Sequence, residues 1–586
     1  MMDSYYGFRF RRWRRVSERR LVKSWRWLRR FIKKNIWRRT PRLRYVQRFL
    51  VSWFAVFGLM VGGLLWQFGQ LERHYLVEQP AAGGSFVEGI VGEFGIFNPL
   101  FAGTAASQAA NRLIFSGLTK SDGRGGIKPD LAEKWQVSQG GQVYTVTLRK
   151  GLQWHDGQPL TAADVVFTIG LIQNRDVGSS WRTVWEGVRV SALNDRQVKF
   201  VLPSPYAPFP HRLTLGLVPK HILSLARPDD VRFVQFNHQP VGSGPFRFDS
   251  FSSNQAELYL EPNEHYALGS PFLRRLVIKT YENYDQLLRA QRLREVDGVG
   301  GFDVRYVADF QNNVRNFHQW LWANQTQVFY NLRRAPLKDL RLRTALTQGA
   351  DLHEIVWALE NRVKMARSPL LADHLGYDSK LRQPGFNLAR SKRLLDTAGW
   401  KPGADGLRAK NGKPLQLTMV APNTEIYPEL ARLLQQQWSK LGITVDLKLE
   451  PLDSLQQDYI RERQFDLLLL DVALGHDSDV YAYWHSSQKD SPGLNFAGYQ
   501  SAAVDEALEA GRTRLDDDIR AAKYQVFLKA WQKDLPGLVL FQPYYFYAER
   551  GLSGLGVRQV GDVTERFANA YQWAVNTKPV PKLSAE

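Results

Sequence analysis

Alternating and continuous runs of hydrophobic residues predict a mixture of strands and helices over most of the chain. Residues 142–148 (QVYTVTL) and 197–202 (QVKFVL) alternate apolar and polar side chains in the manner of half-buried strands. Residues 339–360 carry apolar side chains at helical spacing, and residues 429–449 show a helical pattern followed by a strand pattern. Residues 465–470 (FDLLLL) have the continuous apolar run of a buried strand. Strands and helices mixed in this way favour an α/β fold.

The longest apolar run, residues 49–68 (FLVSWFAVFGLMVGGLLWQF), contains no charged residue. At ~1.5 Å per residue, a helix of this length spans about 30 Å, the thickness of the hydrocarbon core of a membrane. Trp53 and Trp66 lie toward its two ends, where amphipathic rings prefer the interface. A cleaved signal peptide has a shorter apolar region of roughly 7–15 residues, and a buried core helix does not have so basic a flank. We therefore expect one uncleaved transmembrane helix.

Positive charge is concentrated upstream of this run. Residues 1–48 contain 18 Lys and Arg against Asp3 and Glu18, whereas the formal net charge of the whole chain is +21. The remaining residues carry only +5, which excludes a basic nucleic-acid-binding surface as the basis of function. By the positive-inside rule, the tail stays in the cytoplasm and the chain from about Leu71 onward lies outside. The expected location is the cell membrane, with a single pass, a cytoplasmic N-terminus and an extracytoplasmic C-terminal part.

The length of 586 residues suits two to four domains, and a hydrophobic content of 44% is enough to fill their cores. The sequence contains no Cys. This excludes disulfides, thiolate zinc sites, cysteine nucleophiles and a lipid-modified N-terminal cysteine. The motifs G-x-S-x-G, G-x-x-x-x-G-K-[ST], G-x-G-x-x-G and H-E-x-x-H are also absent from the sequence.

Three polar or glycine-rich clusters are candidates for chemistry. Residues 476–479 (HDSD) are hard metal ligands, but their spacing fits no specific metal loop, and such residues more often form turns and helix caps. Residues 242–245 (GSGP) lack the spacing of a phosphate loop and predict a tight turn with close backbone packing. His485 follows several aromatic residues and is predicted to be a packed or capping residue. We expect no metal site, no cofactor and no catalytic residue.

The stretch 148–168 (LRKGLQWHDGQPLTAADVVFT) sets His155 beside Asp156 and so raises the possibility of a catalytic or metal-binding cluster. However, Asp156-Gly157 is a strong turn pair, and Thr161 with Asp164 has the spacing of a helix capping box. The pattern therefore predicts a turn between a strand and a capped helix. The alternative is an envelope hydrolase that uses His155, Asp156 or the 476–479 cluster.

Residues 129–168 resemble the signature region of the family 5 extracellular solute-binding proteins, the oligopeptide- and dipeptide-binding components of ABC importers. Further segments resemble this family in the same order along the chain: residues 84–118, 217–222, 240–246, 331–355 and 481–509. The resemblance covers about residues 84–578. It implies an α/β, two-lobed periplasmic-binding-protein-like fold with an extra small domain in lobe 1, and a cleft that closes around an extended ligand.

The transmembrane prediction and the resemblance together define the expected domains. These are a basic cytoplasmic tail (1–48), a transmembrane anchor (49–70), a linker (71–84), lobe 1 (85–325) with its small domain (about 120–235), lobe 2 (326–540), a return to lobe 1 (541–580) and a short tail (581–586). The first lobe is therefore expected to be discontinuous in sequence.

The resemblance implies a protein that captures oligopeptides and delivers them to the permease subunits of an ABC importer. The expected partners are a peptide, the permease and the membrane through residues 49–68, with no nucleic acid, and the protein is expected to be a monomer. Other members of the family take nickel, sugars or haem. A further alternative is a ligand sensor that signals through the basic tail.

The resemblance also implies where the ligand is held. A loop of lobe 1 at 104–107, an aromatic residue of the small domain and a lobe 2 loop at 471–479 correspond to ligand-contacting positions of the family. An Asp in the last loop holds the peptide α-amino group in family members, and either Asp471 or Asp477 aligns with it here. The family's usual Gly-Trp pair is replaced by Asp471-Val472. The expected ligand-binding residues are Thr104, Ser107, Trp181, Asp471, His476 and Asp477.

Overall fold

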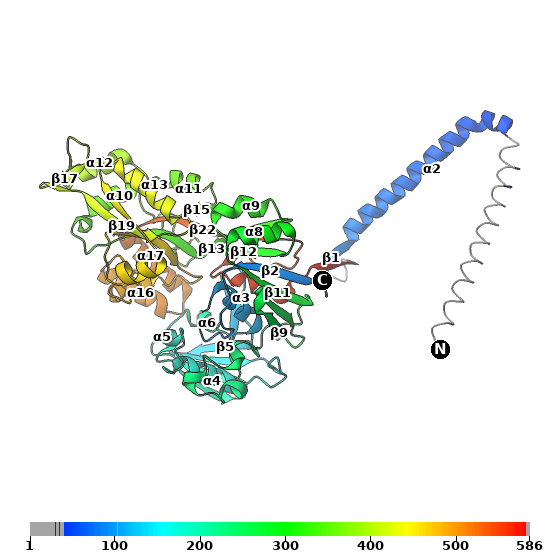
Figure 1. Cartoon of the computed structure of the whole chain (residues 1–586), viewed down its shortest axis with the longest axis horizontal. Coiled ribbons are helices and arrows are strands. Elements are labelled where there is room, and N and C mark those ends of the chain that lie inside the picture. The colour runs from blue at the N-terminus through cyan, green and yellow to red at the C-terminus, as the bar shows by residue number, and fades with distance from the viewer. Residues whose placement is uncertain (1–29, 31–33, 35–39, 102, 582–586) are drawn as a thin grey trace. The chain divides into compact units, whose positions relative to one another are not determined.

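The computed structural model describes residues 30, 34, 40–101 and 103–581 (Figure 1). Most of the basic tail expected over 1–48, and all but the first residue of the short tail expected over 581–586, lie outside the described residues. The chain divides into two units, Met1–Gln79 with Lys578–Glu586, and Pro80–Thr577. We describe each unit separately.

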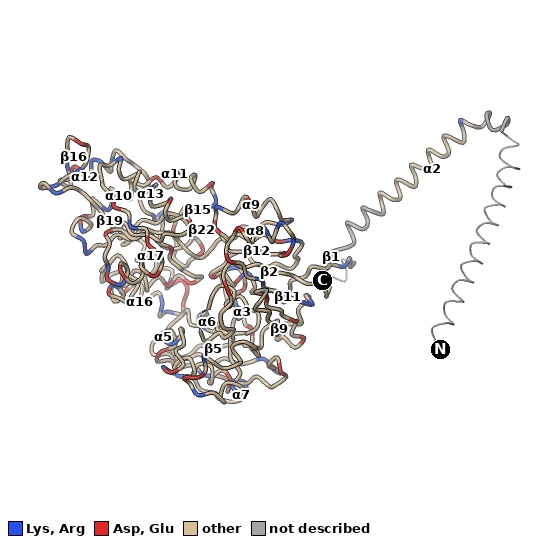
Figure 2. Tube along the Cα trace, viewed as in Figure 1, with Lys and Arg blue, Asp and Glu red and all other residues tan. Residues whose placement is uncertain are grey.

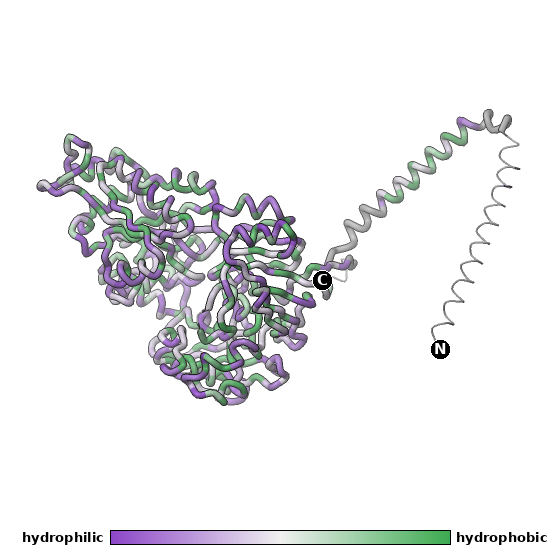
Figure 3. The backbone as a smooth tube through the Cα atoms, viewed as in Figure 1, coloured by the Kyte–Doolittle hydropathy of each residue, from purple (hydrophilic) through white to green (hydrophobic). Residues whose placement is uncertain are grey.

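The first unit contains one long helix, α2 (Thr40–Tyr75), and the strand β1 (Leu76–Ala81), which pairs with β24 (Asn576–Pro581). The segment Gln47–Gln67 of α2 is long and apolar enough to cross a membrane (Figure 3), and none of its side chains is buried. Arg48 at its start is the one charged residue of this segment, and Figure 2 shows none over the rest of it. The linker expected over 71–84 is therefore corrected, because its first part continues α2 and then forms β1. No Gly or Pro interrupts residues 70–79, so local propensity favours this continuation.

The larger unit has two lobes built on one continuous sheet. Among the described residues this sheet has 13 strands, with β2 parallel to both β11 and β12 in lobe 1. The lobe 1 elements are β2 (Ser85–Val91), α3 (Ala105–Ile114), β9 (Phe246–Ser252), β10 (Glu257–Pro262), β11 (Arg275–Tyr281), α8 (Tyr284–Leu293), β12 (Gly298–Gly300), α9 (Val307–Gln311), β13 (Asn316–Trp322) and β23 (Gln559–Val560). The parallel strands are joined through helices, as such pairs require.

A smaller four-stranded antiparallel sheet, in the order β5-β6-β8-β7, forms the small domain of lobe 1. Its elements are β5 (Ala132–Ser138), β6 (Val143–Leu148), α4 (Ala162–Gln173), α5 (Arg182–Trp185), β7 (Arg189–Asn194), β8 (Gln197–Val201), α6 (Phe209–Arg212) and α7 (Lys220–Leu223), preceded by the hairpin β3 (Thr119–Ser121) and β4 (Ile127–Pro129). The alternating patterns at 142–148 and 197–202 correspond to β6 and β8, which pair with each other.

Lobe 2 contains the strands β14 (Asn324–Tyr330), β15 (Val363–Met365), β16 (Lys401–Pro402), β17 (Arg408–Lys410), β18 (Lys413–Pro414), β19 (Gln416–Pro422), β20 (Thr444–Glu450) and β21 (Leu467–Ala473). Its helices are α10 (Leu340–Gly349), α11 (Leu352–Ala358), α12 (Leu388–Thr397), α13 (Tyr427–Ser439), α14 (Leu452–Ser454), α15 (Tyr481–Trp484), α16 (Ala502–Thr513) and α17 (Asp517–Asp534). The single helix predicted over 339–360 is wrong. Asp351 accepts hydrogen bonds from the backbone N–H groups of His353 and Glu354, so it caps a second helix and divides the segment in two.

The continuous apolar run at 465–470 has a direct structural cause. Leu467 and Leu469 of β21 pack into one hydrophobic core of lobe 2, whereas Leu468 packs into another. Successive side chains of a strand point to opposite faces, so a strand covered on both faces needs an apolar residue at every position.

The strand β22 (Gly537–Glu549) connects the two lobes (Figure 1). Its first half pairs with β14 of lobe 2, and its second half pairs with β12 and β13 of lobe 1. The chain also passes between the lobes at Ala323, which separates β13 from β14. The two lobes are therefore joined near Ala323 and near Pro543. These crossings lie within three residues of the boundaries expected from the sequence, 325 and 540.

Candidate functional site

A cavity of about 700 Å³ lies between lobe 1, its small domain and one loop of lobe 2. Its wall is mostly apolar and comes from four parts of the chain: residues 99–127, 180–216, 474–479 and 561–565. Pockets of about 300–1,000 Å³ with an apolar wall and a few convergent polar groups are typical of small-ligand sites. This cavity is therefore the candidate ligand site.

The helix α3 presents one face to the cavity. Gln108, Asn111, Arg112 and Phe115 follow the three- and four-residue spacing that places side chains on one side of a helix. The Oδ1 atom of Asn111 is buried and accepts no hydrogen bond among the described residues. A ligand N–H group could supply this missing partner.

Two expected ligand residues, Thr104 and Ser107, hold the start of α3 and do not line the cavity. Thr104 is the N-cap residue, and its side chain accepts a hydrogen bond from the Ser107 backbone N–H group at 3.3 Å. The Ser107 side chain is fully buried, and its Oγ accepts a hydrogen bond from the Gly95 N–H group at 2.7 Å. Their neighbours Gly103 and Gln108 line the cavity instead.

The small domain contributes an aromatic wall. Trp181 lines the cavity with 41% of its surface exposed, and its indole N–H group donates to the Pro99 carbonyl oxygen at 3.0 Å. The Arg212 guanidinium lies 4.3 Å from the centre of the Tyr206 ring and donates to the Val184 carbonyl oxygen at 2.8 Å. Trp181 and Arg212 are thus held in fixed orientations at the same wall.

The lobe 2 loop of the cavity begins where the chain crosses between lobes. The Ala323 carbonyl oxygen accepts hydrogen bonds from the backbone N–H groups of both Leu474 and Gly475, each at 3.0 Å. His374 bonds to the Gly475 carbonyl oxygen at 3.0 Å, and burial lowers the pKa of His374. The loop is therefore fixed to the crossing point, so a change of angle between the lobes also moves the loop.

Two carboxylates of this loop are neutralised by arginines of lobe 2. Arg520 donates two hydrogen bonds to Asp477, at 2.7 and 2.8 Å, and Arg512 donates to Asp479 at 2.9 Å. Burial raises the pKa of Asp479, and the charge of Arg512 lowers it. The Asp477 carboxylate, expected as a candidate amine-binding group, is thus already held by a buried guanidinium.

The remaining candidate of the lobe 2 segment, Asp471, lies outside the cavity. The strand β21 continues to Ala473, so Asp471 is part of the sheet rather than of the loop expected over 471–479. The Thr326 hydroxyl of the paired strand donates to the Asp471 carboxylate at 2.5 Å. Although Asp471 is exposed at the surface, many protein atoms surround its carboxylate and displace water from it, which raises its pKa. The hydrogen bonds from Thr326 and Tyr427 lower the pKa, but by less.

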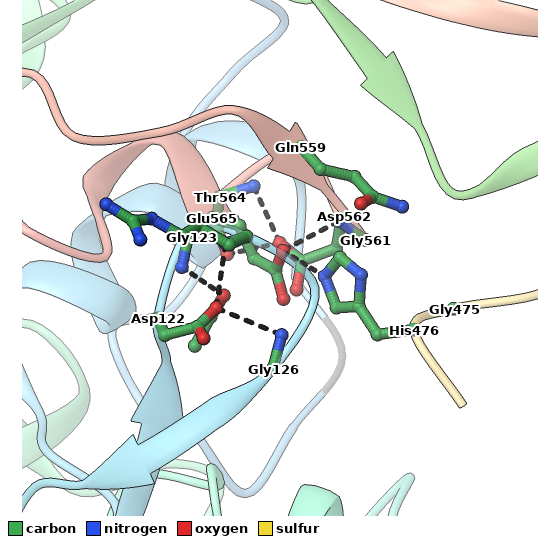
Figure 4. A network of polar contacts seen from close by, with 12 residues as sticks. Asp122, Gly123, Gly126, Gly475, His476, Gln559, Gly561, Asp562, Thr564 and Glu565 are labelled. Carbon is green, nitrogen blue, oxygen red and sulfur yellow. Dashed lines mark hydrogen bonds and ion pairs between the residues drawn. The ribbon is translucent and has the colours of Figure 1, made fainter. Parts of the chain in front are cut away.

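His476 forms an ion pair across the two lobes (Figure 4). Its Nε2 atom lies 2.7 Å from the Glu565 carboxylate, and both side chains are nearly buried, with 5% and 11% of their surface exposed. Burial lowers the pKa of His476, but the hydrogen bond and the negative charge of Glu565 outweigh this and raise the pKa overall. Glu565 also accepts a hydrogen bond from the Gly561 N–H group at 2.6 Å, which fixes its orientation.

Further contacts join the lobes around the same cavity. Gln559 of lobe 1 donates to the Asp373 carboxylate of lobe 2 at 2.7 Å, close to the His476 pair. Elsewhere, the Ala207 N–H group donates to the Arg512 carbonyl oxygen at 2.8 Å. The Arg512 guanidinium also lies 5.2 Å from the Tyr206 ring of the small domain. The lobes therefore meet through residues of two different parts of lobe 1, and the cavity lies between them.

The His155-Asp156 stretch is architectural, as the turn and capping pattern predicted. The Nε2 atom of His155 lies 3.1 Å from the Gly244 carbonyl oxygen, and Nδ1 accepts from the Gly242 N–H group at 3.2 Å. Burial lowers the pKa of His155 to about 4, so the ring is neutral at pH 7. Asp156 instead pairs with His221 within the small domain, at 2.7 Å.

The capping box at the start of α4 is confirmed. The Thr161 hydroxyl accepts from the Ala163 N–H group at 3.3 Å, and the Asp164 carboxylate accepts from the Thr161 N–H group at 2.9 Å. Within the described residues, no group of three or more His, Asp or Glu side chains is arranged to hold a metal ion.

Most of the polar groups around the cavity could not be found from the sequence. Arg212, Arg512, Arg520 and Glu565 lie in different segments and carry no local motif. The exception is α3, where the spacing of Gln108, Asn111 and Arg112 could have been read as one polar helical face.

A two-lobed α/β chain, with two crossings between lobes and a cavity at the interface, defines a solute-binding protein of the periplasmic-binding-protein type. The family model of the bacterial extracellular solute-binding proteins, family 5, matches residues 126–493. The chain belongs to this family, so both the predicted resemblance and the predicted two-lobed fold are confirmed. The family consists of substrate-binding transport proteins rather than enzymes.

Several known proteins are similar to this chain. The oligopeptide-binding protein AppA of Bacillus subtilis is 28% identical over 79% of this chain and 87% of its own, and protein XP55 of Streptomyces lividans is 31% identical over 78% and 83%. The solved structure of Bacillus subtilis AppA with a nonapeptide superposes with a TM-score of 0.69 at 26% identity, over 85% of this chain and all of that chain. That of NikZ from Campylobacter jejuni with Ni(L-His) gives a TM-score of 0.68 at 27% identity, over 84% and 99%.

Proposed function

We propose that this protein captures oligopeptides in the interlobe cavity and delivers them to the permease subunits of an ABC importer. The observation that carries the proposal is the cavity itself. It lies between two lobes that are in contact, and the chain belongs to family 5 of the solute-binding proteins. Relatives named for oligopeptide and dipeptide binding support a peptide as the ligand. A volume of about 700 Å³ favours a short peptide.

The ligand contacts that we propose follow from the wall of the cavity. Trp181 supplies an exposed ring face for an apolar ligand side chain. Asn111 supplies a carbonyl oxygen for a ligand N–H group. His476 and Asp477 belong to the loop that closes the cavity from lobe 2. Thr104 and Ser107 act indirectly, because they fix the first turn of α3.

We further propose that α2 anchors the protein in the cell membrane, with the basic tail in the cytoplasm, and that the protein acts as a monomer. The apolar segment Gln47–Gln67 and the positive charge before it support this topology. The anchor predicts that the protein stays in the membrane pellet at high pH and dissolves only in detergent. Release by alkaline carbonate would contradict it, and would favour a cleaved signal sequence.

Peptide capture is tested by thermal unfolding of the full-length protein in detergent. A ligand at about 100 times its dissociation constant adds about 2.7 kcal/mol to the free energy of unfolding. We expect pools of short peptides to raise the melting temperature, whereas nickel chelates, sugars and haem leave it unchanged. Shifts from one of those compounds and none from peptides would contradict peptide capture and support the matching non-peptide alternative.

A pair of tryptophan variants locates the binding site. Trp181→Ala removes the exposed ring at the cavity and is expected to weaken peptide binding about tenfold or more. Trp357→Ala is the matched control, because Trp357 is 75% exposed and does not line the cavity. Equal binding by the two variants would show that the peptide lies elsewhere.

A further inference from the structure

The carboxylates that line the cavity are all neutralised by cations of the same chain. Asp477 and Asp479 are held by arginines of lobe 2, as described above. Asp562 pairs with Arg112 at 3.3 Å, and Glu565 pairs with His476 at 2.7 Å. A ligand ammonium group would therefore have to compete with an existing partner at each of these carboxylates.

Arg212 is in the opposite situation. It lines the cavity, yet no carboxylate lies within 4.0 Å of it among the described residues. A guanidinium has five N–H donors, and within the described part of the chain one side-chain hydrogen bond is formed, to the Val184 carbonyl oxygen. The Tyr206 ring lies 4.3 Å from the centre of the guanidinium and restricts its movement, and the remaining donors are available to a bidentate acceptor in the cavity.

The neighbours of Arg212 favour the same kind of ligand group. His211 lines the cavity beside it, and burial lowers the pKa of this imidazole, so the ring is neutral at pH 7 and can act as a hydrogen-bond donor. Trp181 supplies an apolar face on the same wall. A carboxylate with an adjacent apolar group fits this combination.

We propose that the cavity selects ligands that carry a carboxylate and do not need a free ammonium group, and that Arg212 is the carboxylate receptor. This inference rests on the proposed function for its substrate class and sharpens it: the preferred peptides are short, have a free C-terminal carboxylate, and tolerate a blocked N-terminus. It differs from capture through an Asp and the peptide α-amino group, because the cavity carboxylates are already paired.

The test uses the full-length protein in detergent and one tripeptide, Ala-Phe-Ala, in four forms: with a free or acetylated N-terminus, and with a free or amidated C-terminus. Binding is measured by calorimetry. We expect amidation to weaken binding by about tenfold or more, since it removes a charge-assisted pair with Arg212. We expect acetylation to change the affinity by less than threefold.

Variants assign the effect to Arg212. Arg212→Gln is expected to bind the acid and the amide equally, and Arg212→Lys is expected to keep part of the preference. Arg182→Gln is the matched control, because Arg182 lies in the same small domain but does not line the cavity, and it should behave as the parent protein. Thermal melts confirm that each variant is folded.

A second series, indole-3-propionate against its amide, separates this inference from peptide capture. If the peptides do not bind but the indole acid is preferred in an Arg212-dependent manner, the peptide proposal fails and the carboxylate receptor stands. If neither series prefers the acid over the amide, or if acetylation abolishes binding while amidation does not, the inference is overturned.

Discussion

The interlobe pair His476–Glu565 gives the account a quantitative test. The substitution Glu565→Gln keeps the size of the side chain and its ability to accept hydrogen bonds from His476 and Gly561, so only the negative charge is lost. The pair is 2.7 Å apart and nearly buried, so solvent screens it weakly. A charge-assisted hydrogen bond contributes about 1.5–3 kcal/mol, and the neutral bond that replaces it contributes about 1 kcal/mol. The difference is about 0.5–2 kcal/mol; its central value of roughly 1 kcal/mol is about fivefold in the equilibrium between open and closed lobes, and its upper end is about thirtyfold.

The expected result is a peptide affinity about fivefold weaker at pH 6, and no more than about thirtyfold weaker, measured by calorimetry. The sign of the pH dependence follows from the raised pKa of His476 in the structure, where His476 and Glu565 of the two lobes are in contact. The stabilisation is fully present below the ordinary histidine pKa of about 6.5 and is lost as the pH rises through the raised value. The parent protein should therefore bind more weakly at pH 9 than at pH 6, and the variant should approach it at pH 9.

The matched control is Asp156→Asn. It removes a carboxylate that lies 2.7 Å from a histidine, but both residues belong to the small domain and the pair does not join the lobes. This variant should keep the affinity of the parent protein. The reasoning is refuted if Glu565→Gln binds peptide as tightly as the parent at pH 6, or if both variants lose affinity equally.

The other predictions concern stability and are measured by urea unfolding. The neutral, buried His155 has a pKa of about 4 in the folded protein. The free energy of unfolding should therefore fall by about 3 kcal/mol as the pH drops from 6.5 to 4. A His155→Gln variant whose stability falls as steeply with pH as that of the parent would contradict this. Gly242→Ala places a Cβ 1.9 Å from a backbone oxygen of α3 and should destabilise the fold by about 3 kcal/mol. The control Gly170→Ala in α4 places a Cβ with nothing within 4 Å and should stabilise the fold slightly. Equal effects of the two substitutions on the free energy of unfolding would rule out the packing argument. Arg520→Gln leaves the Asp477 carboxylate without its partner and should lower the free energy of unfolding by about 3 kcal/mol. Adding Asp477→Asn in the double variant should restore part of this loss. If the effects of the two substitutions simply add, the two side chains are not coupled.

Local patterns predicted much of the fold. The capping box at Thr161 and Asp164 was readable because both partners lie within one helical turn. The strand at 465–470 was readable because a strand covered on both faces needs an unbroken apolar run. The prediction of one helix over 339–360 failed because the helical spacing of apolar residues continues across two helices. This spacing does not reveal that Asp351 caps the second helix.

The candidate site was much harder to predict from the sequence. Trp181 was placed through the resemblance to the family, and it lines the cavity. Asp471 was misplaced because β21 is longer than the apolar run suggests. The pairs of Asp477 with Arg520 and of His476 with Glu565 join residues 43 and 89 positions apart, so only the tertiary fold brings them together.

The most direct test of the central claim is to identify the molecule that the protein carries. The full-length protein is purified from membranes in detergent without added ligand, denatured, and its bound small molecules are analysed by mass spectrometry. The account predicts short peptides with a free C-terminal carboxylate. A sugar, haem or metal chelate in their place, with no peptide, would contradict it.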